Sequence, residues 1–78
     1  MVKVTVYSTS ACPWCVKAKE WLKEHKINFV EINVQQDRKA AEEMIQKSGQ
    51  TGVPVIEIDS KIIVGFNLPE IKRALGME

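Results

Sequence analysis

The sequence is poor in cysteine, in aromatic residues and in net charge of either sign. Eleven Lys and Arg are offset by ten Asp and Glu, which leaves a net charge of +1, and the basic residues are scattered along the chain. Because no basic stripe is available to neutralise phosphates, we expect no nucleic-acid partner. No apolar segment approaches the roughly 20 residues of a membrane helix, and the start, MVKVTVYS, has no secretory-signal pattern. These absences predict a cytoplasmic protein that binds neither nucleic acid nor membrane.

The two cysteines, Cys12 and Cys15, are too few for a disulfide-rich secreted scaffold. In a reducing cytosol a CxxC pair is typical of metal binding or redox chemistry. A structural disulfide would stabilise little here, because closing a loop of about four residues removes only about 2 kcal/mol of chain entropy. The length of 78 residues predicts one domain, spanning residues 1–78, so any function must lie on one small scaffold.

Apolar periodicity predicts seven elements in the order βαβαββα. Residues 2–7 alternate apolar and polar side chains as a strand does, whereas the apolar residues from Pro13 onward recur at helical spacing. The strand at 27–34 is apolar on both faces, so we expect it inside the sheet. The expected strands are 2–7, 27–34, 53–59 and 61–66, and the expected helices are 13–26, 37–49 and 67–76.

This order predicts an α/β architecture with a four-stranded mixed sheet and helices on both faces. The first two strands flank a helix and are expected to be parallel, joined by a right-handed crossover. Only Asp59 and Ser60 separate the last two strands, which we therefore expect to form an antiparallel hairpin.

The CxxC pair lies where the first strand gives way to the first helix, with Cys12 at the helix N-terminus. Unpaired backbone N–H groups and the positive end of the helix dipole stabilise a thiolate there, which makes Cys12 the expected nucleophile. Cys15 lies one turn further along the same face, deeper and less ionised, and is the expected resolving thiol. Pro13 begins the helix, and Trp14 places a large apolar ring beside the sulfurs.

A metal site is the alternative interpretation of the same cysteines. A structural zinc site needs a full tetrahedral set of ligands, whereas this chain offers two thiols and one imidazole, His25, ten residues beyond Cys15. A dimer could instead share a metal or an iron–sulfur cluster through Cys12 of each copy, with further thiols from a small molecule. This binding module is the alternative to redox catalysis.

Three short motifs resemble those of glutaredoxins and their thioredoxin-fold relatives: CPWC at residues 12–15, TGVP at 51–54 and VGFN at 64–67. The similarity runs over essentially the whole chain. It implies the thioredoxin fold and dithiol–disulfide oxidoreductase activity without a bound metal or organic cofactor. The implied substrates are protein disulfides or glutathione mixed disulfides.

The resemblance also implies roles for residues outside the CxxC pair. It implies a cis peptide bond between Val53 and Pro54, facing the cysteines. The backbone N–H and C=O of Val53 would pair with the substrate as a neighbouring strand does. The implied substrate surface lies around Trp14, Val53, Gly65 and Phe66.

The electron donor stays open between glutathione and thioredoxin reductase. Glutathione-dependent relatives usually carry a lysine where this chain has Thr9, and Gly-Gly followed by an acid where it has Gly65, Phe66 and Asn67. Losing two hydrogen bonds to charged groups would weaken glutathione binding about 10²- to 10⁴-fold. Free N–H groups near Asn67 could still hold a carboxylate. In length the chain resembles redoxins that are recycled by thioredoxin reductase, whereas its CPWC motif resembles that of glutathione-using members. Nothing in the sequence suggests more than a monomer.

Overall fold

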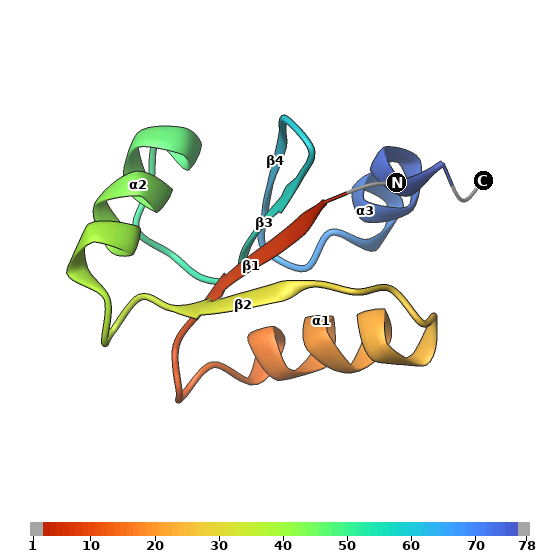
Figure 1. Ribbon diagram of the computed structural model, residues 1–78, viewed down its shortest axis with the longest axis horizontal. Helices are drawn as coiled ribbons and strands as arrows, with labels where there is room; N and C mark the ends of the chain where they lie inside the picture. The colour runs from red at the N-terminus through yellow and green to blue at the C-terminus, as the bar shows by residue number, and fades with distance from the viewer. Residues whose placement is uncertain (1–2, 77–78) are drawn as a thin grey trace.

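The computed structural model describes residues 3–76, which form a four-stranded sheet with three helices packed against it (Figure 1). The order βαβαββα is confirmed. The later strands are shorter than the apolar runs that predicted them, because flanking apolar residues such as Val53 and Phe66 pack on the core from loops. The elements are β1 (Val4–Ser8), α1 (Pro13–Glu24), β2 (Val30–Asn33), α2 (Arg38–Ser48), β3 (Val55–Ile58), β4 (Lys61–Val64) and α3 (Leu68–Leu75).

The sheet has the strand order β2-β1-β3-β4, which places β1 between two neighbours. β1 runs parallel to β2, with Val6 opposite Glu31, and antiparallel to β3. β3 and β4 form an antiparallel hairpin with Ile56 opposite Ile63. The mixed sheet and all the expected pairing directions are therefore confirmed.

The prediction that residues 27–34 form an interior strand is wrong. Within this range only Val30–Asn33 form a strand, and β2 lies at an edge of the sheet. Val30 is 53% exposed, whereas Ile27 and Phe29 precede the strand and pack against the core cluster that contains Leu22. The run is apolar because its first part closes the core from a loop, not because both faces of one strand are covered.

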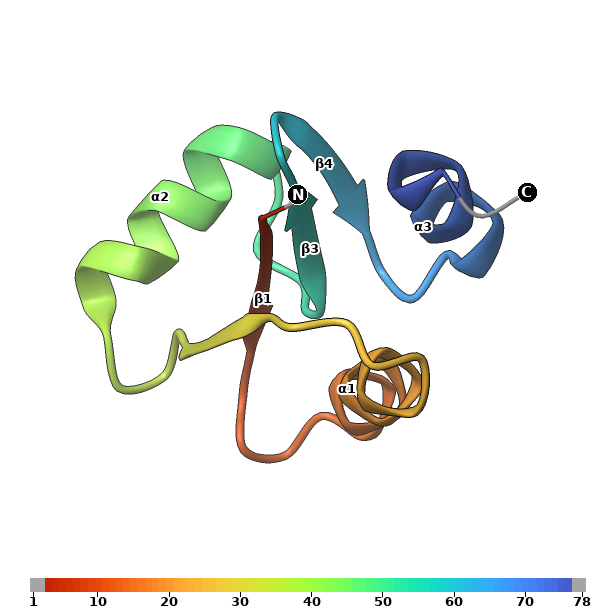
Figure 2. The same ribbon diagram turned by 45° about the vertical axis from the view of Figure 1, so that its right-hand side comes forward.

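Helices cover both faces of the sheet, with α1 and α3 on one side and α2 on the other (Figure 2). Successive strand residues face opposite ways, so Val6 packs with α1 and α3 while Tyr7 packs with α2. Burial of Ala18 and Leu22 holds α1 against the sheet and its first turn beside the end of β1. The larger cluster contains Val4, Val6, Ala18, Leu22, Ile56, Ile58, Ile63 and Ile71, and the smaller contains Tyr7, Ala40, Met44 and Val55.

The helix ends follow local capping chemistry. Asp37 caps α2, accepting the Ala40 N–H at 3.0 Å, and Asn67 caps α3. α1 begins at Pro13 but ends at Glu24, two residues before the expected limit. The chain turns out of the helix at Lys26, whose φ of 57° lies in the left-handed region and cannot continue a right-handed helix.

Candidate active site

Cys12 is the N-cap residue of α1, and its side chain is half-buried. Its backbone is extended, with φ −104° and ψ 106°, while its carbonyl already accepts the Val16 N–H at 3.2 Å. The Cys12 Sγ accepts the Cys15 N–H at 3.1 Å, taking the position that a serine or aspartate oxygen takes in an ordinary cap. A sulfur anion at Cys12 therefore meets both a backbone donor and the positive end of the helix dipole.

Cys15 is fully buried one turn further along α1. Burial, together with the smaller effect of the contact with Cys12, raises the pKa of its thiol to about 12, against an opposing hydrogen bond from the Thr9 backbone. Desolvation dominates because an isolated anion in the interior loses its water. Both cysteines are free thiols, so the structure shows the reduced dithiol, with Cys15 protonated at neutral pH.

Iodoacetamide at neutral pH is expected to label Cys12 and leave Cys15 unlabelled in the folded protein. A thiol with a pKa of about 12 is ionised to only about 1 part in 10⁵ at pH 7, and Cys15 is also enclosed. Mass spectrometry of the peptides measures the ratio, with urea-unfolded protein as the control in which both label. Cys15 labelling in the folded state should rise with pH. Equal labelling of both native cysteines would contradict the prediction.

A cavity of about 260 Å³ adjoins the start of α1 and is lined by residues from three separate segments. Trp14, which is 56% exposed, belongs to α1 and forms one wall. The peptide bond between Val53 and Pro54 is cis, as the resemblance implied. The cavity brings together five residues expected at the substrate site: Trp14, Val53, Pro54, Gly65 and Phe66.

Gly65 fits this site through its backbone. Its φ of 78° lies in the left-handed region that glycine adopts without steric cost. Its N–H donates to the Pro54 carbonyl at 2.8 Å, which ties the end of β4 to the residue before β3. Pro54 itself is buried, so the hydrogen bond fixes one wall of the cavity from inside.

Thr9 and Asn67, the remaining expected binding residues, do not line the cavity. Thr9 is half-buried in the loop after β1, and its backbone hydrogen-bonds the Cys15 thiol. Asn67 is exposed, and its Oδ1 accepts the Glu70 N–H at 3.5 Å as the cap of α3.

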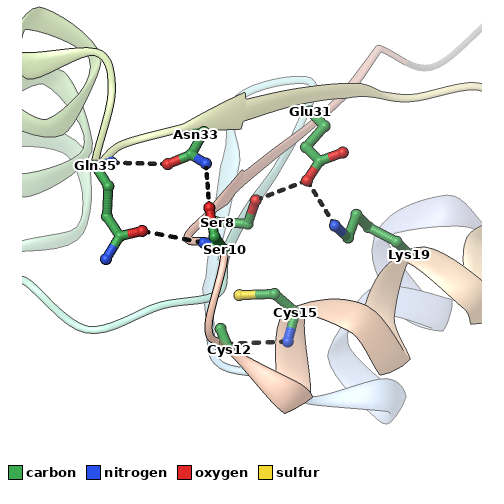
Figure 3. A network of polar contacts seen from close by, with 8 residues as sticks. All are labelled: Ser8, Ser10, Cys12, Cys15, Lys19, Glu31, Asn33 and Gln35. Carbon is green, nitrogen blue, oxygen red and sulfur yellow. Dashed lines mark hydrogen bonds and ion pairs between the residues drawn. The ribbon is translucent and has the colours of Figure 1, made fainter.

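The sequence analysis missed the residues that hold the loop between β1 and α1 (Figure 3). Asn33 donates from Nδ2 to Ser10 Oγ at 3.0 Å, and the Ser10 N–H donates to Gln35 Oε1 at 3.2 Å. Asn33 also accepts the Gln35 N–H at 2.9 Å. The available signal was the cluster of polar residues after two parallel strands, whose carboxyl ends share one edge of the sheet.

Lys17 is an exposed residue of α1 that contacts one wall of the cavity through Trp14. Its ammonium lies 4.8 Å from the centre of the Trp14 ring, which places a positive charge beside the cavity. The two residues are three apart on α1, a spacing that makes helix neighbours.

Within residues 3–76, no group of three or more His, Cys, Asp and Glu side chains is arranged to hold a metal ion. His25 lies at the far end of α1, where its ring stacks on Trp21 at 4.1 Å and its Nδ1 contacts the Trp21 carbonyl. The contacts of His25 therefore lie at the C-terminal end of α1 and not beside the cysteines. No helix in the described part of the chain has the length and apolar character needed to cross a membrane.

The site therefore combines a half-buried capping thiol, a buried partner thiol and an adjoining cavity. Residues 4–63 also match the family model named Glutaredoxin. The chain belongs to the glutaredoxin family. Members are thiol–disulfide oxidoreductases, and this glutaredoxin is an enzyme of that class. The family predicted from CPWC, TGVP and VGFN is confirmed.

Relatives of this glutaredoxin come from more than one branch. A glutaredoxin-like protein of the rubredoxin operon of Clostridium pasteurianum is 54% identical over 72 residues, covering 92% of this chain and 96% of the relative. Glutaredoxin 3 of Escherichia coli K12 is 38% identical over 65 residues, covering 83% and 78%. The glutaredoxin-like protein NrdH of Lactococcus lactis subsp. cremoris is 39% identical over 70 residues, covering 90% and 96%.

The fold has a matching solved structure. A crystal structure of a mutant of the thioredoxin-like protein BC3987 superimposes with a TM-score of 0.90 at 28% identity, covering 96% of each chain. The predicted thioredoxin fold is therefore confirmed.

Proposed function

We propose that this glutaredoxin reduces protein disulfides and glutathione mixed disulfides, with Cys12 as nucleophile and Cys15 as resolving thiol. The observation that carries the proposal is the asymmetry of the pair. The Cys12 Sγ is accessible and accepts the Cys15 N–H at 3.1 Å, whereas Cys15 is buried with its pKa raised to about 12. Only Cys12 is both reachable and stabilised as a thiolate by the helix N-terminus.

The reaction has two exchange steps. The Cys12 thiolate attacks one sulfur of the substrate disulfide, a mixed disulfide forms, and the first substrate thiolate leaves. Cys15 then loses its proton to solvent and attacks the Cys12 sulfur. The bond between Cys12 and the substrate breaks, the second substrate thiolate leaves and takes up a proton, and the protein ends as the Cys12–Cys15 disulfide. Two electrons pass from the protein to the substrate.

The cavity supports the placement of the substrate. An extended substrate segment would pair with the backbone of Val53, which is half-buried on the cavity wall. The exposed ring of Trp14 and the half-buried Phe66 offer apolar contact on either side. The Lys17 ammonium over Trp14 favours substrates with an acidic group near the disulfide.

The oxidised protein must be reduced again, and two donors fit the site. Thr9 and Asn67 do not supply the charged contacts expected for glutathione, which favours thioredoxin reductase. The exposed start of α3 at Asn67 offers N–H groups for a carboxylate, which favours glutathione. Relatives named glutaredoxin 3 and NrdH are almost equally similar, at 38% and 39% identity.

Reduction of insulin, with NADPH consumption followed in parallel cuvettes, tests the function and the donor. One cuvette contains glutathione and glutathione reductase, and the other contains thioredoxin reductase. Turnover in the first alone assigns glutathione as the donor, and turnover in the second alone assigns thioredoxin reductase. Absence of turnover in both would contradict the proposal.

A Thr9→Lys variant is expected to gain glutathione-linked turnover by about 10-fold at low glutathione. One hydrogen bond to a charged group contributes about 1.5 kcal/mol or more, which is about tenfold in affinity. Thr9→Met is the matched control, because it adds a long side chain without the charge. The apparent Michaelis constant for glutathione measures the effect, and an equal change in both variants would contradict a charge contact at this position.

The same proposal places the protein in the cytoplasm as a monomer with one domain and no bound cofactor. The alternative, a cluster shared between two copies through Cys12, predicts coloured protein that elutes as a dimer. Visible absorbance, metal content and size-exclusion chromatography of the purified protein separate the two interpretations.

A further inference from the structure

Three polar residues from three elements form a connected cluster beside Cys15: Ser8 of β1, Lys19 of α1 and Glu31 of β2 (Figure 3). We name it the Lys19 cluster. The Lys19 ammonium lies 2.6 Å from Glu31 Oε2, and the Ser8 hydroxyl donates to the same oxygen at 3.1 Å. Ser8 is fully buried at the end of β1, so its hydroxyl anchors the Glu31 carboxylate, which in turn holds Lys19.

Lys19 is four residues after Cys15, so the two side chains are neighbours on one face of α1. In Figure 3 both leave the helix on the side of β1, with the Cys15 thiol below the Ser8 strand end and the ammonium reaching toward Glu31. The Lys19 side chain is only 21% exposed, which limits screening of its charge by water. Its field lowers the pKa of the Cys15 thiol, against the larger effect of burial.

Cys15 meets a defined set of polar and charged groups. From α1 and its N-cap come the Lys19 ammonium and the Cys12 sulfur, and from the loop after β1 comes the Thr9 backbone, which hydrogen-bonds the thiol. From β2 comes the Glu31 carboxylate, which acts through Lys19. Hydrogen bonds from Lys19 and then Ser8 hold the pKa of Glu31 below its ordinary value, so Glu31 is ionised at neutral pH and offsets part of the Lys19 charge.

We propose that Lys19 is a positioning residue for the resolving step. Its ammonium places a positive charge beside Cys15, and the Glu31 carboxylate determines how strongly that charge acts on the thiol. The inference rests on the proposed role of Cys15. Cys15 must give up a proton before it attacks the Cys12 sulfur, and negative charge then develops in a buried site. The ammonium stabilises that charge until the Cys12–Cys15 bond has formed and the substrate thiolate has left. The Glu31 carboxylate reduces the electrostatic effect of the Lys19 ammonium on Cys15 but holds the ammonium in its orientation.

The test isolates the second exchange from the first. Reduced protein is mixed with the symmetrical disulfide of thionitrobenzoate, whose released thiolate is coloured. Attack by Cys12 releases the first coloured thiolate, and attack by Cys15 on the Cys12 sulfur releases the second. The first phase depends on reagent concentration and the second does not, so stopped-flow absorbance yields a separate rate constant for each.

Lys19→Met, which keeps the apolar stem, should slow the second phase about three- to tenfold at neutral pH, because one nearby charge is lost. Glu31→Gln should speed it about twofold or more, because the ammonium is then uncompensated. Lys19→Arg should stay close to the unaltered protein. Lys19→Met and Glu31→Gln break the same ion pair. If that ion pair only supported the structure, both variants would shift the second-phase rate in the same direction.

Opposite shifts for Lys19→Met and Glu31→Gln support the inference. Equal shifts, or second-phase rates unchanged in both, overturn it while leaving the proposed function intact. The unaltered protein is the separate check on that function. If it releases only one coloured thiolate, Cys15 does not resolve, and the proposed mechanism itself fails.

Discussion

A Cys12→Ser variant is expected to lose disulfide-reducing turnover by at least about 10³-fold, because a serine hydroxyl is not ionised at neutral pH and cannot replace a thiolate nucleophile. The fold should survive, since serine is also a good N-cap residue and can accept the Cys15 N–H that Cys12 Sγ accepts now. The insulin assay measures the loss, and thermal unfolding confirms the fold.

Cys15→Ser is the matched variant, because it removes the second thiol and leaves the first. It should retain the first exchange and stop at the mixed disulfide with Cys12, which mass spectrometry detects as a mass increase equal to the substrate thiol less two hydrogens. Turnover of protein disulfides should fall strongly, whereas a glutathione mixed disulfide can still be released by a second glutathione. Full insulin turnover in Cys12→Ser, or the loss of the first exchange in Cys15→Ser, would contradict the assigned roles.

A Leu22→Ala variant is expected to lose about 3 kcal/mol of unfolding free energy. This loss of stability is the second of the two largest effects that we expect. Leu22 has no exposed surface and lies in the cluster that packs α1 on the sheet, so truncation leaves a cavity that a small core cannot easily fill. For a domain of this size the melting temperature should fall by about 10–25 °C. Thermal unfolding followed by circular dichroism makes the measurement.

Ile45→Ala is the control for Leu22→Ala, because Ile45 is also a large helical residue but is 41% exposed. Its loss should cost under about 1 kcal/mol. Equal destabilisation by both substitutions would contradict the assignment of Leu22 to the core that supports the active-site helix.

The elements that the sequence predicted well are those with strong local chemistry. α2 lies between its Asp37 cap and Gly49, whose φ is 74°, and α3 follows the Asn67 cap. The element with the largest error is the run at 27–34, because an apolar residue buried from a loop looks the same in sequence as one buried in a strand. Ile27 and Phe29 pack on the core without belonging to β2.

The candidate active site likewise contains features that the sequence predicted and others that it did not. The change from strand to helix periodicity at Pro13 placed Cys12 at a helix N-terminus, and the CxxC spacing then placed Cys15 one turn inside, since a helix repeats every 3.6 residues or so. Neither the approach of Lys19 to Glu31 nor the support of the loop by Asn33 follows from spacing. Both depend on β2 pairing in parallel with β1, which brings residues 12 and 23 positions apart in the chain into contact.

The sequence by itself determined the element order, the capping thiol and its partner, because periodicity, caps and short spacings act within a few residues along the chain. Only the tertiary structure decided which strand lies at the edge, how Trp14, Val53 and Phe66 enclose one cavity, and which charge stands beside the buried Cys15 thiol. Those features depend on how buried surfaces pack, and the energy of packing depends on contacts between residues that are distant in sequence.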